Sequence, residues 1–313
     1  MTAASAQRVE IAMCVDEGFA MPLSVALASL DAVSWGRPTR VSVLQPGFGA
    51  DTKARITRGL RHLEVVWHDL DEDRVAGAHF PPQLSRATLY RLLLEQILPS
   101  DIERLIYLDG DIVVLDSLAP LFDAELGGRA LGAVRDANSP WCAGICGPDW
   151  QRLGLAPDSP YFNAGILLID LAAWRRERIG ERALDVLRRQ SPQWADQDAL
   201  NIILEGRWTE LPRRWNLQTA DVSGNSTGWA VFGDDTRAAT ADPAVIHYSG
   251  IGQPKPWQLG CAHPALATWL EWLDRSAWSG WRPPREPALD RWARAAVRTV
   301  RRARHAQRGG LPT

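Results

Sequence analysis

Lysine is almost missing from this sequence of 313 residues, because only Lys53 and Lys255 occur and arginine supplies the rest of the 35 basic residues. Cysteine is scarce too, with four residues at positions 14, 142, 146 and 261. Cys142 and Cys146 have no second pair, so the spacing favours neither a zinc site nor a disulfide framework. Reduced thiols are typical of a cytoplasmic protein, and we expect that location.

Long apolar runs and a strong charge of one sign are also missing. No uncharged apolar stretch reaches the roughly 20 residues of a membrane-spanning helix, and the first residues lack the pattern of a signal peptide. The formal net charge of −2 does not favour general nucleic-acid binding. Because 46% of the residues are hydrophobic, we predict a globular protein of one large domain or two small ones.

The charge is unevenly distributed along the chain. Residues 282–313 contain nine arginines against two acidic residues, so the preceding part is net acidic. A helix over 289–304 would place Trp292 and aliphatic side chains on one face and arginines on the other. Such a helix suits an anionic membrane surface at the inner membrane face, or it docks on the body. We therefore expect a domain of residues 1–281 and a basic amphipathic tail of residues 282–313.

Strand and helix patterns alternate through the first part of the chain. Helical patterns cover 22–33, 52–59, 85–98 and a run that ends at 189, and apolar strand patterns cover 9–15, 41–44, 64–67, 104–116, 131–134 and 161–170. This alternation predicts an α/β fold with a mostly parallel sheet and helices on both faces. Ligands bind beyond the carboxyl ends of such strands. A long loop over 137–160 is expected to be functional.

Two carboxylates interrupt the most apolar of these strands. Asp109 and Asp111 flank Gly110 within the run 104–116, and in a regular strand they would share a face. Burying both without a compensating charge would be costly, which favours a divalent cation. Hard oxygen ligands suit Mg²⁺ or Mn²⁺ holding a diphosphate. The alternative is a strand end with solvated acids.

Further polar residues stand at element ends. Asp16 follows the first strand, and Arg91 lies among leucines, where it should extend to solvent or reach an anion. Asp196 suits a helix N-cap or first turn, or a ligand role. His247 ends a strand that begins at Val245 and precedes a loop containing Lys255. Three tryptophans in loop-like sequence are candidates for stacking on an acceptor sugar: Trp141, Trp150 and Trp229.

Taken together, these stretches resemble glycosyltransferase family 8, which contains glycogenin and the bacterial lipopolysaccharide α-galactosyl- and glucosyltransferases. The resemblance covers roughly residues 9–260 in the family's order. It includes Val15-Asp16, the helix with Arg91, Leu-Asp-Gly-Asp at 108–111, Phe-Asn-Ala-Gly at 162–165, Asp-Gln-Asp at 196–198, and His-Tyr-Ser-Gly at 247–250 followed by Lys255-Pro-Trp.

The resemblance implies a GT-A type, Rossmann-like fold with a C-terminal helical extension. It also implies transfer of a hexose from a UDP-sugar, UDP-glucose or UDP-galactose above all, with retention of configuration, to a glycan, lipid-linked or small-molecule acceptor. Mn²⁺, with Mg²⁺ as the alternative, would be held by Asp109, Asp111 and His247. The donor would be bound by Cys14, Val15, Asp16, Phe19, Arg91, Asp109, Gly110, Asp136, Asn163, Gly165, Gly250 and Lys255.

For the reaction, the resemblance places Gln197 opposite the anomeric carbon. Since an amide is a poor nucleophile, same-face attack by the acceptor hydroxyl is favoured. A covalent intermediate on Asp196 or Asp198 is the less favoured variant. The sequence departs from the family at Asp16-Glu17-Gly18, at Phe19 in place of a tyrosine, and in the longer interval between His247 and Lys255.

Three other functions are weighed against transfer. Self-glucosylation is disfavoured because the four tyrosines all lie within or beside motif segments. A nucleotidyltransferase usually has a Gly-rich basic loop after its first strand, which is not found at 16–19. A non-catalytic sugar-nucleotide-binding protein of the same fold is the remaining alternative, although the complete set of acids, His and Lys argues against it.

Overall fold

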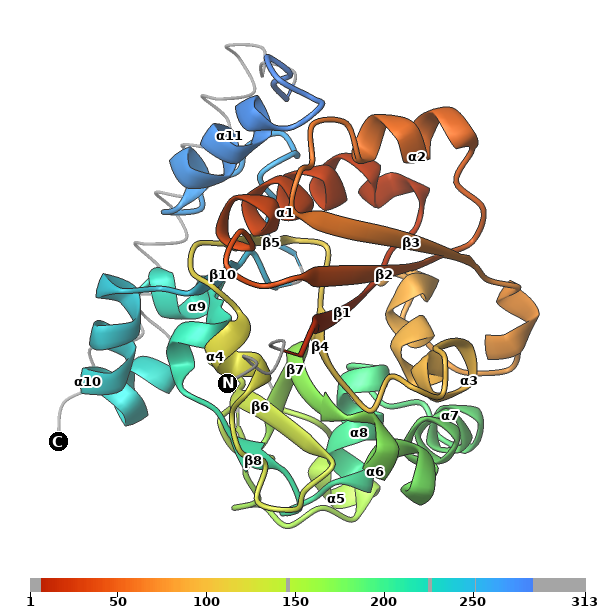
Figure 1. The fold of residues 1–313 in the computed structure, drawn as a ribbon. Helices are drawn as coiled ribbons and strands as arrows, with labels where there is room; N and C mark the ends of the chain where they lie inside the picture. Colours follow the sequence, from red (N-terminus) through yellow and green to blue (C-terminus); the bar gives the residue numbers. More distant parts are fainter. Residues whose placement is uncertain (1–6, 145–146, 225–226, 251, 284–313) are drawn as a thin grey trace, which may run out of the picture.

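The computed structural model describes residues 7–144, 147–224, 227–250 and 252–283 (Figure 1). A seven-stranded sheet with the order β3-β2-β1-β4-β7-β6-β8 forms its centre. Its strands are β1 (Val9–Cys14), β2 (Thr39–Gln45), β3 (Leu63–Asp69), β4 (Arg104–Leu108), β6 (Leu131–Arg135), β7 (Phe162–Asp170) and β8 (Thr209–Glu210). Only β7 runs antiparallel to its neighbours within this sheet. The predicted mostly parallel α/β fold is therefore confirmed.

The strand expected over 104–116 is wrong in one respect, because the chain leaves the central sheet after β4. Residues Ile112–Val114 form β5, which belongs to a second sheet of three strands in the order β5-β10-β9. In that sheet β10 (Val245–His247) is antiparallel to β5 and parallel to β9 (Leu217–Gln218). Asp109 and Asp111 thus lie in the link between two sheets rather than on one face of a regular strand.

Helices cover both faces of the central sheet (Figure 1). Alternate residues of β1 point to opposite faces of the sheet. Ala12 and Cys14 pack in the core on one face, and Ile11 and Met13 pack in the core on the other. The first side is covered by η3 (Arg86–Leu93), α3 (Leu94–Ile97), α6 (Leu171–Glu177), α7 (Ile179–Arg189) and α8 (Asp196–Ile203). The second side is covered by α1 (Ala20–Val33), α2 (Ala50–Ile56) and α4 (Ala119–Phe122).

The remaining elements are short connecting helices and the helices near the second sheet. They are η1 (Glu17–Phe19), η2 (Glu72–Val75), α5 (Trp150–Leu153), η4 (Arg213–Asn216), α9 (Thr219–Val222), α10 (Thr227–Ala241) and α11 (Leu266–Arg275). Trp269 and Leu273 of α11 pack with Val113 of β5 and Val25 of α1 in a third core. Figure 1 shows α11 lying alongside α1. Ile246 of β10 belongs to the same core, and its neighbour His247 pairs with Ile112 of β5.

Several local predictions need correction. The helix expected up to residue 189 is two helices, because Arg178 has a positive φ of 53° between α6 and α7. The helix predicted over 85–98 is mostly 3-10, and the loop over 137–160 contains α5. Cys14, Cys142 and Cys261 are free thiols, as expected. No helix in the described ranges is long and apolar enough to span a membrane. The helix predicted over 289–304 lies outside them.

Candidate metal and donor-binding site

The parallel strands bring distant motif residues to one edge of the central sheet. Asp16, Asp109 and Asp136 follow the carboxyl ends of β1, β4 and β6, which all run in the same direction. Because β7 is antiparallel, its first residues, including Asn163, reach the same edge. The expected ligand edge of the sheet is therefore lined with carboxylates and an amide.

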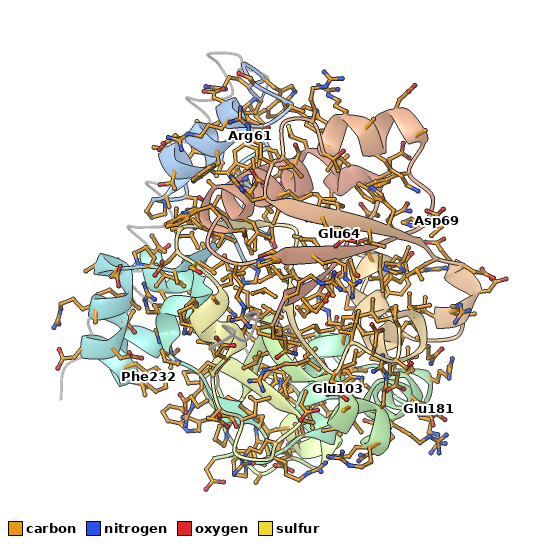
Figure 2. The ribbon with its side chains drawn as sticks, viewed as in Figure 1. Arg61, Glu64, Asp69, Glu103, Glu181 and Phe232 are labelled. Carbon is orange, nitrogen blue, oxygen red and sulfur yellow. The ribbon has the colours of Figure 1, made fainter. Side chains whose placement is uncertain are left out.

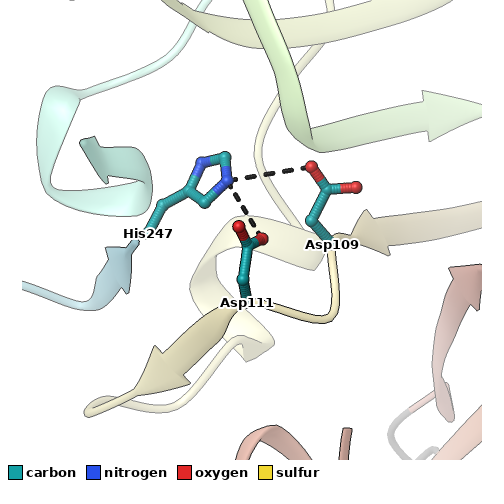
Figure 3. Close-up of side chains that lie close together, drawn as sticks. All are labelled: Asp109, Asp111 and His247. Atoms are coloured by element: carbon teal, nitrogen blue, oxygen red, sulfur yellow. Dashed lines mark ion pairs between the residues drawn. The ribbon is translucent and has the colours of Figure 1, made fainter. Parts of the chain in front are cut away.

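Asp109, Asp111 and His247 converge at this edge (Figure 3). Their ligand atoms all lie within 4.8 Å of one another. Nε2 of His247 is 3.7 Å from Oδ2 of Asp109 and 3.3 Å from Oδ1 of Asp111. One oxygen of each carboxylate thus faces the same imidazole nitrogen, an arrangement that suits a hard or borderline divalent cation.

The other oxygen of each carboxylate accepts a hydrogen bond from a basic side chain. Nη2 of Arg91 donates to Oδ1 of Asp109 at 2.8 Å, and the hydroxyl of Tyr107 donates to the same oxygen at 2.8 Å. Nζ of Lys255 donates to Oδ2 of Asp111 at 2.8 Å. Burial by itself would raise the pKa of Asp111, but the positive charge of Lys255 and the contacts with His247 outweigh it and lower that pKa. Asp111 is therefore ionised and ready to bind a cation.

Glycines make room for this convergence. A Cβ on Gly165 would lie 2.2 Å from Cε1 of His247 and 2.9 Å from Oδ2 of Asp109. A Cβ on Gly110 would lie 2.9 Å from the ring of Phe19 and 3.0 Å from Val15. Both positions exclude a side chain, so the glycines of the two motifs are explained by close approach rather than by a turn conformation.

Asn216 orients the imidazole of His247. Its Oδ1 lies 2.9 Å from Nδ1 of His247, and since an amide oxygen only accepts, Nδ1 carries the proton. In the neutral imidazole Nε2 then carries the lone pair, and since Nε2 faces the two carboxylates, this is the tautomer that a metal ligand requires. The residues present therefore fit a divalent cation. Sequence reasoning did not find Asn216, because no motif or spacing connects it with His247.

Asn163 and Gln197 interlock beside the three metal-ligand candidates. Oε1 of Gln197 accepts from the backbone N–H of Ala164 at 3.0 Å and from Nδ2 of Asn163 at 3.2 Å. Nε2 of Gln197 donates to the hydroxyl of Tyr161 at 3.2 Å and to Oδ2 of Asp136 at 3.4 Å. Three predicted donor-binding or catalytic residues are thus brought into direct contact.

The two aspartates of the Asp-Gln-Asp motif lie in different surroundings. Asp196 is in the first turn of α8 and forms an ion pair with Nε of Arg91 at 3.0 Å, while Ala195 is the N-cap. Burial raises the pKa of Asp196 to about 6, although the charge of Arg91 opposes this. Asp198 is fully buried and accepts from Tyr161 at 2.5 Å and from the backbone of Trp194 at 2.9 Å.

Comparison with known proteins supports the predicted resemblance to glycosyltransferase family 8. The sequence profile of glycosyl transferase family 8 matches residues 10–260. This chain belongs to glycosyltransferase family 8. General stress protein A of Bacillus subtilis is 27% identical over 280 residues, covering 87% of this chain and 95% of that protein. The lipopolysaccharide 1,3-galactosyltransferase of Salmonella typhimurium is 24% identical over 286 residues, covering 88% and 80% of the two chains.

A solved structure shares both the fold and part of the sequence. The galactosyltransferase LgtC, solved in complex with donor and acceptor sugar analogs, superposes with a TM-score of 0.73 at 29% identity. The match covers 86% of this chain and 96% of LgtC. The predicted GT-A fold is confirmed, and the chain is a glycosyltransferase of family 8 with a group of residues that could hold a metal.

The residues predicted to contact the nucleotide lie at and after the end of β1. Oδ2 of Asp16 accepts from the hydroxyl of Ser85, which also caps η3 through the backbone of Ala87. Cys14 and Val15 are buried at the end of β1. Burial raises the pKa of the Cys14 thiol, so this cysteine stays neutral. Ser85 is a second residue that sequence reasoning missed.

Two departures from the family pattern are accommodated by aromatic packing. Phe19 packs edge to face against Trp257, with ring centroids 5.5 Å apart. Trp257 belongs to the same loop as Lys255, so its packing helps bring Lys255 to Asp111 despite the longer interval after His247. Gly250 is exposed with φ of +103°, a conformation that favours glycine.

The tryptophans suggested for acceptor stacking have protein partners. Trp141 stacks on Phe232 with a centroid separation of 6.3 Å, and Figure 2 marks Phe232 on α10. Trp150 packs against the small core around Cys142, and Nε1 of Trp229 donates to the backbone oxygen of Asp221. An acceptor role for these tryptophans stays a prediction.

Proposed function

We propose that this chain is a retaining, metal-dependent hexosyltransferase. It moves a hexose from a UDP-sugar, UDP-glucose or UDP-galactose, to a hydroxyl of a glycan, lipid-linked or small-molecule acceptor. The observation that carries the proposal is the convergence of Asp109, Asp111 and Nε2 of His247 at the ligand edge of the sheet. Membership of family 8 supplies the reaction class.

The donor set suits Mn²⁺, with Mg²⁺ as the alternative. Two carboxylates and one imidazole include a softer nitrogen ligand that Mg²⁺ rarely selects. When bound, the cation supplies a Lewis acid that stabilises negative charge on the diphosphate leaving group. Lys255 adds a second positive charge on the same side, as a point charge that its flexible stem can direct to a phosphate oxygen.

The donor sugar is held by residues that already hold one another. Arg91 is buried with Asp109 and Asp196 as its ion-pair partners, so the sugar-binding edge is rigid before the donor arrives. Gln197 and Asn163 interlock through their amides and present polar atoms beside Asp136. Such preorganisation lowers the cost of ordering the site around the substrate.

In the proposed reaction, the acceptor hydroxyl oxygen forms a bond to the anomeric carbon as the bond between that carbon and the diphosphate oxygen breaks. Attack and departure occur on the same face of the sugar, which retains the configuration. The hydroxyl proton passes to the departing phosphate oxygen. Asp198 is fully buried and already accepts two hydrogen bonds, which supports this route over a covalent intermediate on that residue.

A UDP-release screen tests the proposal. The purified full chain is incubated with several UDP-hexoses and their N-acetyl relatives, with Mn²⁺, Mg²⁺ or EDTA. We expect release of UDP from one hexose donor that depends on the metal and rises when a suitable glycan acceptor is added. NMR of the product is expected to show the α configuration of the donor.

The same screen separates transfer from the non-catalytic alternative. Binding of UDP and Mn²⁺ by calorimetry, without release of UDP from any donor under any acceptor tested, would establish a sugar-nucleotide-binding protein instead. Absence of both binding and release would remove the metal and nucleotide assignments together.

A further inference from the structure

Asn216 lies between the metal-ligand candidates and the donor-sugar side of the site. It is the last residue of η4, directly before β9, and its exposed fraction is 0%. β9 pairs in parallel with β10, with Gln218 opposite His247, so the backbone holds Asn216 beside the imidazole. A fully buried side-chain amide must satisfy its polar atoms within the protein.

Both ends of the Asn216 amide are used, each by a different part of the site. Its Oδ1 accepts from Nδ1 of His247 at 2.9 Å, and its Nδ2 donates to Oδ1 of Asn163 at 2.9 Å. These two partners come from β10 and β7, which belong to different sheets. Asn216 is therefore a direct side-chain bridge between the second sheet and the central sheet.

The hydrogen bonds of this bridge run in one direction. His247 donates to Asn216, Asn216 donates to Asn163, and Nδ2 of Asn163 donates onward to Oε1 of Gln197 and Oδ2 of Asp136, both at 3.2 Å. Reversing any amide would place two acceptors or two donors against each other. The proton on Nδ1 of His247 and the orientation of the Gln197 amide are thus set by the same chain of hydrogen bonds.

We propose that Asn216 is a positioning residue that couples the metal ligand His247 to the donor-sugar residues Asn163 and Gln197. Its oxygen fixes the imidazole tautomer that presents Nε2 to the cation. Its nitrogen fixes Asn163, and through it the amide that faces the reacting carbon. This inference rests on the proposed function, because it assigns a role within the same site.

Two substitutions separate the two halves of the bridge. Asn216→Leu removes both hydrogen bonds while keeping a similar volume. Asn216→Asp keeps an oxygen that accepts from His247 but replaces the donor to Asn163 with a second acceptor. A merely structural role predicts that both variants differ from the wild type in stability alone. The proposed role predicts different changes in metal binding and turnover.

The readouts are the dissociation constant of Mn²⁺ by calorimetry, and kcat and KM for the UDP-hexose identified by the screen. For Asn216→Leu we expect Mn²⁺ affinity to fall by about 10–100-fold, the usual effect of losing the partner of a histidine ligand. For Asn216→Asp we expect Mn²⁺ affinity to stay near the wild-type value. Its kcat is expected to fall about 10–100-fold with the donor KM little changed, because Gln197 is misplaced.

Leu217→Val serves as the matched control. Leu217 is the next residue and is buried in the third core, so this variant disturbs the packing of the same segment without touching the hydrogen bonds. We expect a lowered melting temperature with unchanged Mn²⁺ affinity. Melting temperatures of all variants test whether any loss of binding or turnover is due to unfolding.

Specific outcomes overturn the inference. Wild-type Mn²⁺ affinity in folded Asn216→Leu would show that Asn216 does not position His247. Equal loss of Mn²⁺ affinity in the Leu and Asp variants would show that the oxygen is not what matters. If the wild type binds no Mn²⁺ at all, the proposed function fails first and this inference with it, whereas normal wild-type binding with unaffected variants removes this inference alone.

Discussion

Lys255 and His247 share the carboxylate of Asp111. Nζ of Lys255 donates to Oδ2 at 2.8 Å, while Oδ1 lies 3.3 Å from Nε2 of His247. Lys255 also donates to the backbone oxygen of Tyr248, which precedes the loop that carries it. Since the proposed function directs Lys255 to the diphosphate as well, this lysine has two anionic partners that compete for one charge.

This competition predicts opposite effects of Lys255→Met on the two ligands. Without nucleotide, loss of the positive charge beside Asp111 removes repulsion of the cation, so Mn²⁺ should bind roughly tenfold more tightly. With Mn²⁺ present, UDP should bind roughly tenfold more weakly, because the diphosphate loses a cationic partner. Calorimetric titrations in both orders measure the two constants.

The control for this variant is Lys53→Met, which changes the other lysine of the chain. Lys53 pairs with Asp69 at 2.7 Å, at the end of the edge strand β3 (Figure 2). Neither constant should change in this control. Weaker Mn²⁺ binding in Lys255→Met without nucleotide would contradict the competition and show that Lys255 instead holds Asp111 in place for the cation.

Asp111→Asn should abolish metal-dependent turnover while leaving the fold intact. The amide keeps the shape of the side chain but loses the negative charge that attracts the cation, so UDP release should fall by at least about a hundredfold. Asp116→Asn is the matched control, since Asp116 lies on the same segment and pairs with Arg214 at the surface. Circular dichroism checks the fold, and near-normal release by Asp111→Asn would remove the metal hypothesis.

Gly165→Ala should displace His247 from the carboxylates. The new methyl group would lie 2.2 Å from Cε1 of His247, so the imidazole or β7 must shift. Overpacking of this kind costs about 1–3 kcal/mol of stability, which thermal unfolding measures, and Mn²⁺ affinity should fall as well. Gly36→Ala is the control, because a Cβ there meets nothing within 4 Å. Unchanged Mn²⁺ binding by Gly165→Ala would show that the three metal-ligand candidates do not act as one site.

The basic tail gives a prediction that lies outside the described residues. Truncation after Arg282 removes the arginine-rich segment, so binding to vesicles that contain phosphatidylglycerol should weaken, while UDP release with a small soluble acceptor should persist. Sedimentation with anionic and neutral vesicles measures the difference. Equal vesicle binding with and without the tail would contradict the membrane hypothesis and favour a helix that docks on the body of the protein.

Much of the fold could be predicted from the sequence because its determinants are local. The apolar runs that became β1, β2, β4 and β7 are long and rich in branched residues, and helical patterns separate them. The parallel arrangement follows from that alternation. It places Asp16 and Asp109 at one edge, since strands of equal direction end on the same side of a sheet.

The sequence pattern gave a wrong prediction where one continuous apolar run forms strands in two different sheets. The run 104–116 has the composition of one strand, yet β4 pairs with β1 and β7 while β5 pairs with β10. The apolar composition of the run indicates that both β4 and β5 are buried, but it does not indicate to which sheet each strand belongs. Likewise, the positive φ of Arg178 ends the helix, and arginine has no preference for that conformation that would have predicted it.

The sequence by itself determined which residues are proposed to carry the chemistry, because the two aspartates, His247, Gln197 and Lys255 stand in recognisable motifs. Only the tertiary structure decided how they are oriented. Asn216 and Ser85 belong to no motif, and they reach His247 and Asp16 because β9 lies beside β10 and η3 lies beside the end of β1. The physical reason is that the direction of hydrogen bonds between buried side chains depends on atoms from segments that are distant in the sequence. A local sequence pattern does not show which distant segments come into contact.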